Sequence, residues 1–81
     1  MASLRDVLNH VGKPFELHRD GVVIAQGLAT VRPPLALVEP KAEPKIGDVL
    51  VFGGQRYTVV AVAAEKFQER LDHYRLEVRP S

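Results

Sequence analysis

Three histidines are the first side chains in this sequence that could hold a metal ion: His10, His18 and His73. Zinc sites usually contain at least one closely spaced pair of ligands, such as two histidines one helical turn apart. No two of these histidines show that spacing, and the chain has no cysteine to complete such a site. The sequence therefore predicts no metal site, no disulfide and no thiol chemistry.

Nucleophilic and acid–base catalysis have no better support in the sequence. The only serines, Ser3 and Ser81, stand near the two ends of the sequence, where a preorganised site is difficult to hold. Thr30 and Thr58 fall within predicted strands, and the carboxylates around Glu65 lie in a charged segment typical of a solvated surface. We therefore expect no catalytic residues, no cofactor site and no enzymatic activity.

The charge balance gives little support for nucleic-acid binding. Eleven basic and 10 acidic residues leave a net charge of +1, whereas nucleic-acid surfaces combine basic residues with exposed aromatic rings. Small β-barrels nevertheless bind nucleic acid in many proteins, so a small cytoplasmic nucleic-acid-binding barrel remains the alternative function. The uncharged stretch Gly21–Val31 is too short to span a bilayer, and the sequence begins without the apolar run of a signal peptide. We expect no membrane partner.

The length and composition predict one small domain over residues 1–81. The chain has 81 residues, of which 46% are hydrophobic and 26% charged, which suffices for a single thin core. Residues 3–11 are predicted to form a short helix, with Ser3 as its N-cap and Gly12 as its C-terminal stop. Its apolar residues fall on one helical face; they are Leu4, Val7, Leu8 and Val11.

The rest of the sequence predicts strands joined by hairpins. Asp20-Gly21 and Gly53-Gly54 are two-residue turn signals, and Gly27 suggests a bulge or a bend. The expected strands are Phe15–Arg19, Val22–Thr30, Val49–Phe52, Gln55–Ala63 (buried on both faces) and Asp72–Arg79, with Ala64–Leu71 as a loop or a helical turn. We therefore expect a mainly β fold, a small antiparallel barrel or curled sheet of about five strands with one short N-terminal helix.

Residues 31–45 interrupt the strand pattern and are predicted to form a long proline-rich loop. They contain four of the six prolines, which cannot donate to a sheet ladder but do stiffen a loop. Apolar residues in such a loop suggest docking into a partner, although they could equally fold back over the barrel mouth. The candidate partner-binding residues are Arg32, Pro33, Pro34, Leu35, Leu37, Val38, Glu39 and Lys41.

Several motifs together resemble the small head–tail joining proteins of tailed bacteriophages. The first half carries Leu8–Gly12, Pro14-Phe15-Glu16-Leu17, the Asp20-Gly21 turn and a short strand that ends near Ala29. The second half carries Ile46-Gly47-Asp48-Val49-Leu50 and Gly54-Gln55-Arg56-Tyr57-Thr58-Val59, similar to the family's core of Gly-Asp, strand, glycine turn and strand. The resemblance covers most of the chain and leaves the proline-rich segment as the variable part.

The resemblance implies a structural role in a virion. Family members are small barrels with a long loop, and several copies form a ring between the portal end of the filled capsid and the tail. They bind the portal or an adaptor on one side and tail-completion proteins on the other, and packaged DNA passes through the ring. By this resemblance the chain would be a head–tail connector that is assembled in the bacterial host cytoplasm, with residues 31–45 as its docking element.

Overall fold

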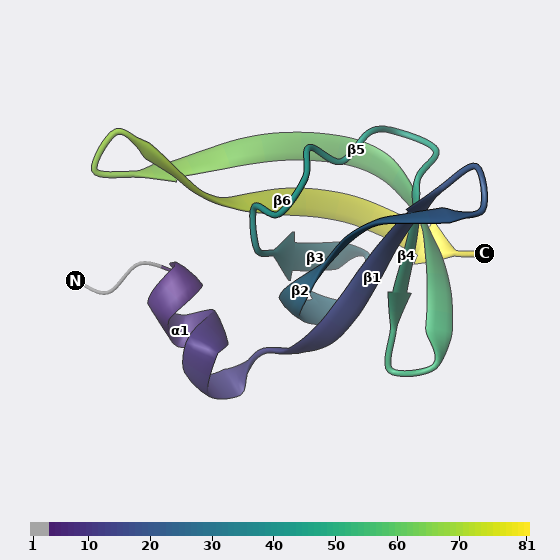
Figure 1. The fold of residues 1–81 in the computed structure, drawn as a ribbon, viewed down its shortest axis with the longest axis horizontal. Helices are drawn as coiled ribbons and strands as arrows, with labels where there is room; N and C mark the ends of the chain where they lie inside the picture. Colours follow the sequence, from purple (N-terminus) through teal and green to yellow (C-terminus); the bar gives the residue numbers. More distant parts are fainter. Residues whose placement is uncertain (1–3) are drawn as a thin grey trace.

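The fold is a closed antiparallel β-barrel with one short helix (Figure 1). The computed structural model describes residues 4–81, with side chains described from residue 7 onward. The mainly β class that the sequence predicts is confirmed, with six strands rather than about five. The elements are α1 (Leu4–Val11), β1 (Lys13–Arg19), β2 (Val22–Arg32), β3 (Leu35–Val38), β4 (Val49–Phe52), β5 (Gln55–Phe67) and β6 (Arg70–Pro80).

The strands follow the order β1-β2-β3-β6-β5-β4 around the barrel, which closes where β4 pairs with β1. Both predicted glycine turns are confirmed. Asp20 and Gly21 have φ values of 53° and 78°, and Gly53 and Gly54 have values of 59° and 78°. Positive φ at both central positions is what a type I′ hairpin turn requires. These turns fix the pairing of β1 with β2 and of β4 with β5.

The core lies inside the barrel and comes from alternate residues of the strands. Leu17 of β1 stands opposite Leu50 of β4, and Ala36 of β3 stands opposite Leu76 of β6; all four are essentially inaccessible. Alternation along each strand leaves the intervening side chains on the outer surface. The buried cluster consists of Phe15, Leu17, Ala25, Ala29, Ala36, Val38, Leu50, Val59, Tyr74, Leu76 and Val78.

β5 is bent by a bulge and continues beyond the barrel as a two-stranded arm with β6. Val59 pairs with Val78 and Ala61 with Glu77, so Val60 is the extra residue. Such a bulge bends a strand and increases its twist. The arm extends to the left of the barrel in Figure 1.

Two predictions for this region are wrong. Residues 64–71 form strand and a tight turn, in which Gln68 and Glu69 have φ values of 52° and 65° without any glycine to signal the turn. Nor is β5 buried on both faces, because a closed barrel leaves one face of every strand outside. Ala61 is accordingly exposed.

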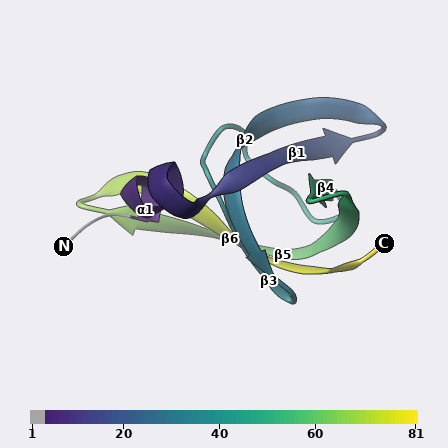
Figure 2. The same ribbon diagram turned by 90° about the horizontal axis from the view of Figure 1, so that it is seen from below.

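Helix α1 packs on the same side of the barrel as the arm and contacts β2 and β6 (Figure 2). Leu8 is completely buried, and its carbonyl oxygen accepts a hydrogen bond from the N–H of Gly12 at 2.9 Å. The predicted apolar face is only partly used, since Val7 and Val11 are 41% and 60% exposed. Ser3, the predicted N-cap, lies outside the described residues.

The predicted loop over residues 31–45 is mostly wrong. Val31 and Arg32 complete β2, and β3 is a strand between β2 and β6. The prolines at 33 and 34 occupy the turn between these strands, where no ladder donor is needed, so they do not exclude strand on either side. Only residues 39–48 are irregular, and they fold back onto the barrel with Ala42 against the core and Pro44 buried.

Gly27 serves a different purpose from the predicted bulge. The irregularity between β1 and β2 leaves Ile24 unpaired instead, since Leu17 pairs with Ala25 and His18 with Val23. A Cβ atom at Gly27 would lie within about 3 Å of Glu39 Oε1 and Lys41 Cγ. Glycine therefore permits the irregular segment to pass close to β2 at this point.

Candidate partner-binding surface

The candidate residues of β3 point alternately into and out of the barrel. Val38 is only 1% exposed and belongs to the core, as does its neighbour Ala36. Leu35 is 41% exposed and Leu37 is half-buried. Of the three apolar candidates, Leu35 and Leu37 are therefore accessible to a partner, whereas Val38 stabilises the fold.

Glu39 and Lys41 lie on the irregular segment and away from the two leucines. The Glu39 carboxylate is buried, and its Oε1 accepts a hydrogen bond from the N–H of Leu28 at 2.7 Å. The N–H of Glu39 in turn donates to the carbonyl of Leu28 at 3.0 Å. Glu39 thus anchors the irregular segment to β2. Lys41 is exposed beside Gly27, on an open groove of about 670 Å³ that also includes Glu16 and Gln26.

Leu35 stands between two hollows on the outer face of β2, β3, β6 and β5. One hollow of about 210 Å³ lies between Leu35, Pro34 and the alanines of β5. The other, of about 90 Å³, lies toward β2 and is lined by Thr30, Arg32, Leu35 and Leu37. We call this area the β3 surface, and it consists of Thr30, Arg32, Pro34, Leu35, Leu37, Ala61, Ala63, Arg75 and Glu77.

The sheet register explains why these residues meet. Leu37 is paired with Arg75, which is itself paired with Ala63 across β6 and β5. Leu35 is likewise in line with Glu77 and Ala61. The small alanine side chains leave the larger hollow open beside Leu35, and the charged side chains of Arg75 and Glu77 also line it. An apolar centre with a polar rim is the usual anatomy of a protein–protein contact.

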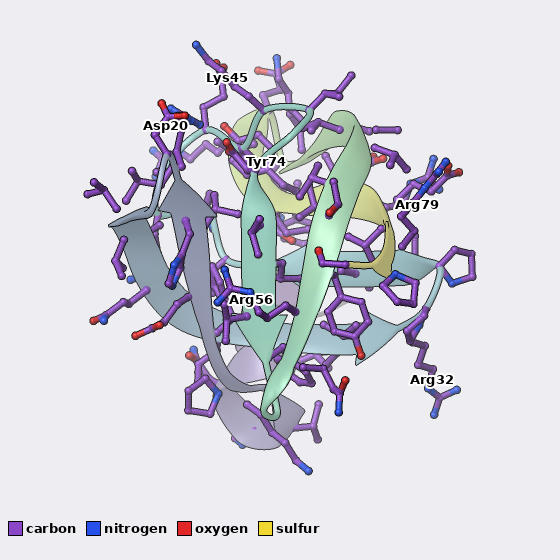
Figure 3. All side chains as sticks on the ribbon, turned by 90° about the vertical axis from the view of Figure 1, so that its right-hand side faces the viewer. Asp20, Arg32, Lys45, Arg56, Tyr74 and Arg79 are labelled. Atoms are coloured by element: carbon purple, nitrogen blue, oxygen red, sulfur yellow. The ribbon has the colours of Figure 1, made fainter. Side chains whose placement is uncertain are left out.

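A second group of exposed apolar residues lies at the end of the barrel that carries the β1–β2 turn. Val22, Val23 and Ile46 are 61%, 42% and 72% exposed. Val22 and Val23 are consecutive in β2 and point to opposite faces of the hairpin; we call the three residues together the loop-end patch. Figure 3 shows the neighbouring Asp20 and Lys45 together at one end, with Arg32 of the β3 surface on the opposite side of the view. The two apolar areas are therefore separate.

An ion pair holds the segment that carries Ile46, one residue of the loop-end patch, in place. Nε and Nη2 of Arg19 donate hydrogen bonds to the Asp48 carboxylate, at 2.9 and 2.8 Å. These hydrogen bonds are the main reason that the pKa of Asp48 lies below its usual value of 3.8, and the N–H of Lys45 adds a further one. The same pairing raises the pKa of Arg19. The segment that carries Ile46 is thereby fixed to β1.

The titratable residues do not gather into a site in the described part of the chain. No group of three or more histidine or acidic side chains there could hold a metal ion. His18 Nε2 lies 3.0 Å from Glu16 Oε1 and lowers the pKa of that carboxyl. His73 Nδ1 lies 2.8 Å from Asp72 Oδ2.

No helix among residues 4–81 is long and apolar enough to cross a membrane.

Sequence reasoning missed the residues that β5 and β6 contribute to the β3 surface. The alternation of Arg75 and Glu77 with buried residues predicts their outward direction. Nothing in the sequence predicts that β6 pairs with β3, because the two strands are far apart in the chain.

No known protein family, characterised protein or solved structure matches the chain.

Proposed function

We propose that this protein is a non-enzymatic connector of a phage or prophage particle, where a ring of copies joins the head to the tail. The observation that carries the proposal is the pair of separate apolar areas, the β3 surface and the loop-end patch. A connector has to bind two different assemblies at once, so it needs two such areas. The motif resemblance over β1, β2, β4 and β5 supports the same role.

In this role one apolar area binds the portal or an adaptor protein, and the other binds tail-completion proteins. A ring with two different faces is built from head-to-tail contacts between its copies. Packaged DNA passes through the ring without sequence-specific contacts, which suits a chain with a net charge of +1. Assembly takes place in the host cytoplasm, and the protein ends in the virion.

The β3 surface is suited to an apolar contact whose strength depends little on salt. Full burial of an exposed leucine side chain contributes about 1.5–3 kcal/mol. Leu35 is 41% exposed and Leu37 is already half-buried, so each gains only part of this. Arg75 and Glu65 on the rim are 3.8 Å apart and exposed, so their attraction contributes little. The leucines therefore dominate the binding free energy of this surface.

A complementation experiment tests the role. Particles are assembled with the double variant Leu35→Asp/Leu37→Asp, and Leu71→Asp serves as the matched control because Leu71 is 39% exposed and Leu35 is 41% exposed. The expected result is filled heads without tails for the double variant and complete particles for the control, as seen by electron microscopy. Complete particles with the double variant would remove the β3 surface from the assembly mechanism.

A further inference from the structure

The barrel is closed, but the arm leaves the outer edge of β5 open. β4 pairs with β5 only over residues 55–58. Val59 is held on the same side by hydrogen bonds with Gly47 and Asp48, both 2.9 Å. Beyond Val59 no strand among the described residues pairs with this side of β5. Residues 60–67 therefore present unpaired backbone groups along one edge of the arm.

The middle of this edge, residues 61–64, lacks the features that keep sheet edges from pairing. The bulge at Val60 and the register shift after Glu65 lie on either side of it, and the charged residues Glu65 and Lys66 follow it. Natural edge strands are protected by prolines, bulges or charges. The sequence of residues 60–67 is Val-Ala-Val-Ala-Ala-Glu-Lys-Phe, with no proline or glycine and a net charge of zero. An uncharged stretch of open strand edge offers backbone groups to a further strand. We propose that two copies of the free protein pair through this edge, antiparallel and about a two-fold axis.

The two-fold axis restricts the register of the pair. In an antiparallel pair of identical strands related by a two-fold axis, directly opposite side chains point to the same face of the sheet. One residue of β5 therefore stands opposite its own copy, and the axis lies midway between these two residues. Near the middle of the open edge this residue is Ala63, Ala64 or Glu65. A centre at Glu65 would place two carboxylates directly opposite each other, which is unfavourable.

The charges on β6 decide between the two alanines. In each copy Ala61 is in line with Glu77, and Ala63 is in line with Arg75. A centre at Ala63 puts Glu65 opposite the second copy's Ala61 and thus toward the second copy's Glu77. A centre at Ala64 puts Glu65 opposite the second copy's Ala63 and toward the second copy's Arg75.

Glu65 already lies 3.8 Å from Arg75 of its own copy, so the centre at Ala64 brings the two pairs together with unlike charges facing each other, whereas a centre at Ala63 brings Glu65 toward a second carboxylate. Adjacent strands are about 4.8 Å apart, so Glu65 and the second copy's Arg75 are about 10 Å apart between their strands. Two long side chains span that distance because the alanine between them is only a methyl group.

The pair is a state of the free protein, and the inference does not depend on the connector role. A two-fold contact joins identical surfaces and closes on itself, whereas a ring with unlike faces needs head-to-tail contacts. If the protein does enter such a ring, the pair dissociates first. Pairing would then protect the open edge until the particle partners are present.

Cysteine cross-linking of the purified protein tests the register. The chain has no cysteine of its own, so an Ala64→Cys variant forms an intermolecular disulfide only through position 64. Directly opposite Cα atoms lie about 4.5–5.5 Å apart, which a disulfide can bridge. Ala61→Cys is the matched control: both alanines are exposed, but the two copies of residue 61 would be about 20 Å apart.

We expect oxidised glutathione to convert the Ala64→Cys variant into a covalent dimer at least tenfold faster than the Ala61→Cys variant. The unmodified chain should sediment at twice its mass of 9.0 kDa, and Ala64→Lys should sediment as a folded monomer. A monomeric unmodified chain at every concentration, or equal cross-linking at both positions, would overturn the proposal. Neither result would affect the connector role, because no particle protein is present.

Discussion

Arg19 and Asp48 form a two-pronged ion pair between β1 and the irregular segment before β4. Nε donates to Oδ1 at 2.9 Å, and Nη2 donates to Oδ2 at 2.8 Å. Nη2 also donates to the carbonyl of Glu43 at 3.0 Å. Asp48 is 3% exposed, whereas the Arg19 side chain is 34% exposed. One arginine thus fixes both ends of the segment that carries Ile46.

Replacement of Asp48 by asparagine should destabilise the protein and make its free energy of unfolding depend less on pH in the acid range. The pKa of Asp48 is lowered in the folded state, so its contribution is present above the unfolded pKa near 3.8 and is lost as the pH falls through the folded pKa. We expect Asp48→Asn to lower the free energy of unfolding by about 1–3 kcal/mol at neutral pH. Urea titrations from pH 7 to pH 2 measure both effects.

In those titrations the curves of the unmodified chain and of Asp48→Asn should converge in acid. The unmodified chain loses stability below about pH 4, and the variant loses less. Some acid dependence remains in the variant, because the pKa of Glu16 is also lowered, mainly by its hydrogen bond with His18. Curves that stay parallel across the range would show that Asp48 does not contribute in this way.

Replacement of Gly27 by alanine should destabilise the barrel through overpacking. The new Cβ would lie 3.0 Å from Glu39 Oε1, 3.0 Å from Lys41 Cγ and 3.1 Å from Phe15 Cε1. Overpacking of this kind costs about 1–3 kcal/mol. The comparison is with Gln26→Ala at the exposed neighbouring position, by urea denaturation. Equal stability of the two variants would mean that the irregular segment moves aside freely.

Helix α1 should depend on a single buried leucine. Leu8 is fully buried and Val7 is 41% exposed. We expect Leu8→Ala to lower the free energy of unfolding by about 2–5 kcal/mol and Val7→Ala to change it much less. Thermal denaturation followed by circular dichroism distinguishes them. A similar loss for both variants would contradict the packing of α1 described above.

Aspartate substitutions on the two faces of β3 should have different effects on folding. Leu35→Asp/Leu37→Asp introduces carboxylates on the outer face and should leave a folded barrel, whereas Val38→Asp buries a charge in the core and should unfold it. The near-ultraviolet circular dichroism of Tyr74, which is buried beside Val38, reports on the barrel interior. Loss of this signal in the double variant would show that the outward leucines belong to the core.

Local signals in the sequence predicted the fold class and the two hairpins with glycine turns, because a glycine turn or an alternating strand depends only on near neighbours. Four prolines led us to expect a loop over residues 31–45, although Ala36 and Val38 fill the core between them. The arm was missed for a related reason, since its turn uses Gln68 and Glu69 at positive φ instead of glycine. Pairing with β6 outweighed the local preference at β3, and pairing with the directly following strand did so in the arm.

The candidate surface was predicted only in part for the same reason. Leu35 and Leu37 stood out because they are apolar residues between prolines. The alternation of β3 then removed Val38 from the candidates, and the register with β6 added Arg75. A register between distant strands depends on tertiary structure, so no spacing in the sequence could have predicted it.

A cross-linked pull-down tests the connector role most directly. The tagged protein is cross-linked through its lysines in a lysate that contains its native particle, with and without nuclease treatment, and the products are identified by mass spectrometry. Lys13 lines a hollow together with Thr30 and Arg32 of the β3 surface, and Lys45 precedes Ile46. The connector role predicts that Lys13 and Lys45 cross-link to different particle proteins, with a portal or adaptor protein on one side and a tail-completion protein on the other. Leu35→Asp/Leu37→Asp should abolish the Lys13 products alone. Recovery of ribosomal or nucleoid proteins that disappear after nuclease treatment, without particle proteins, would contradict the connector role and favour a nucleic-acid-binding barrel.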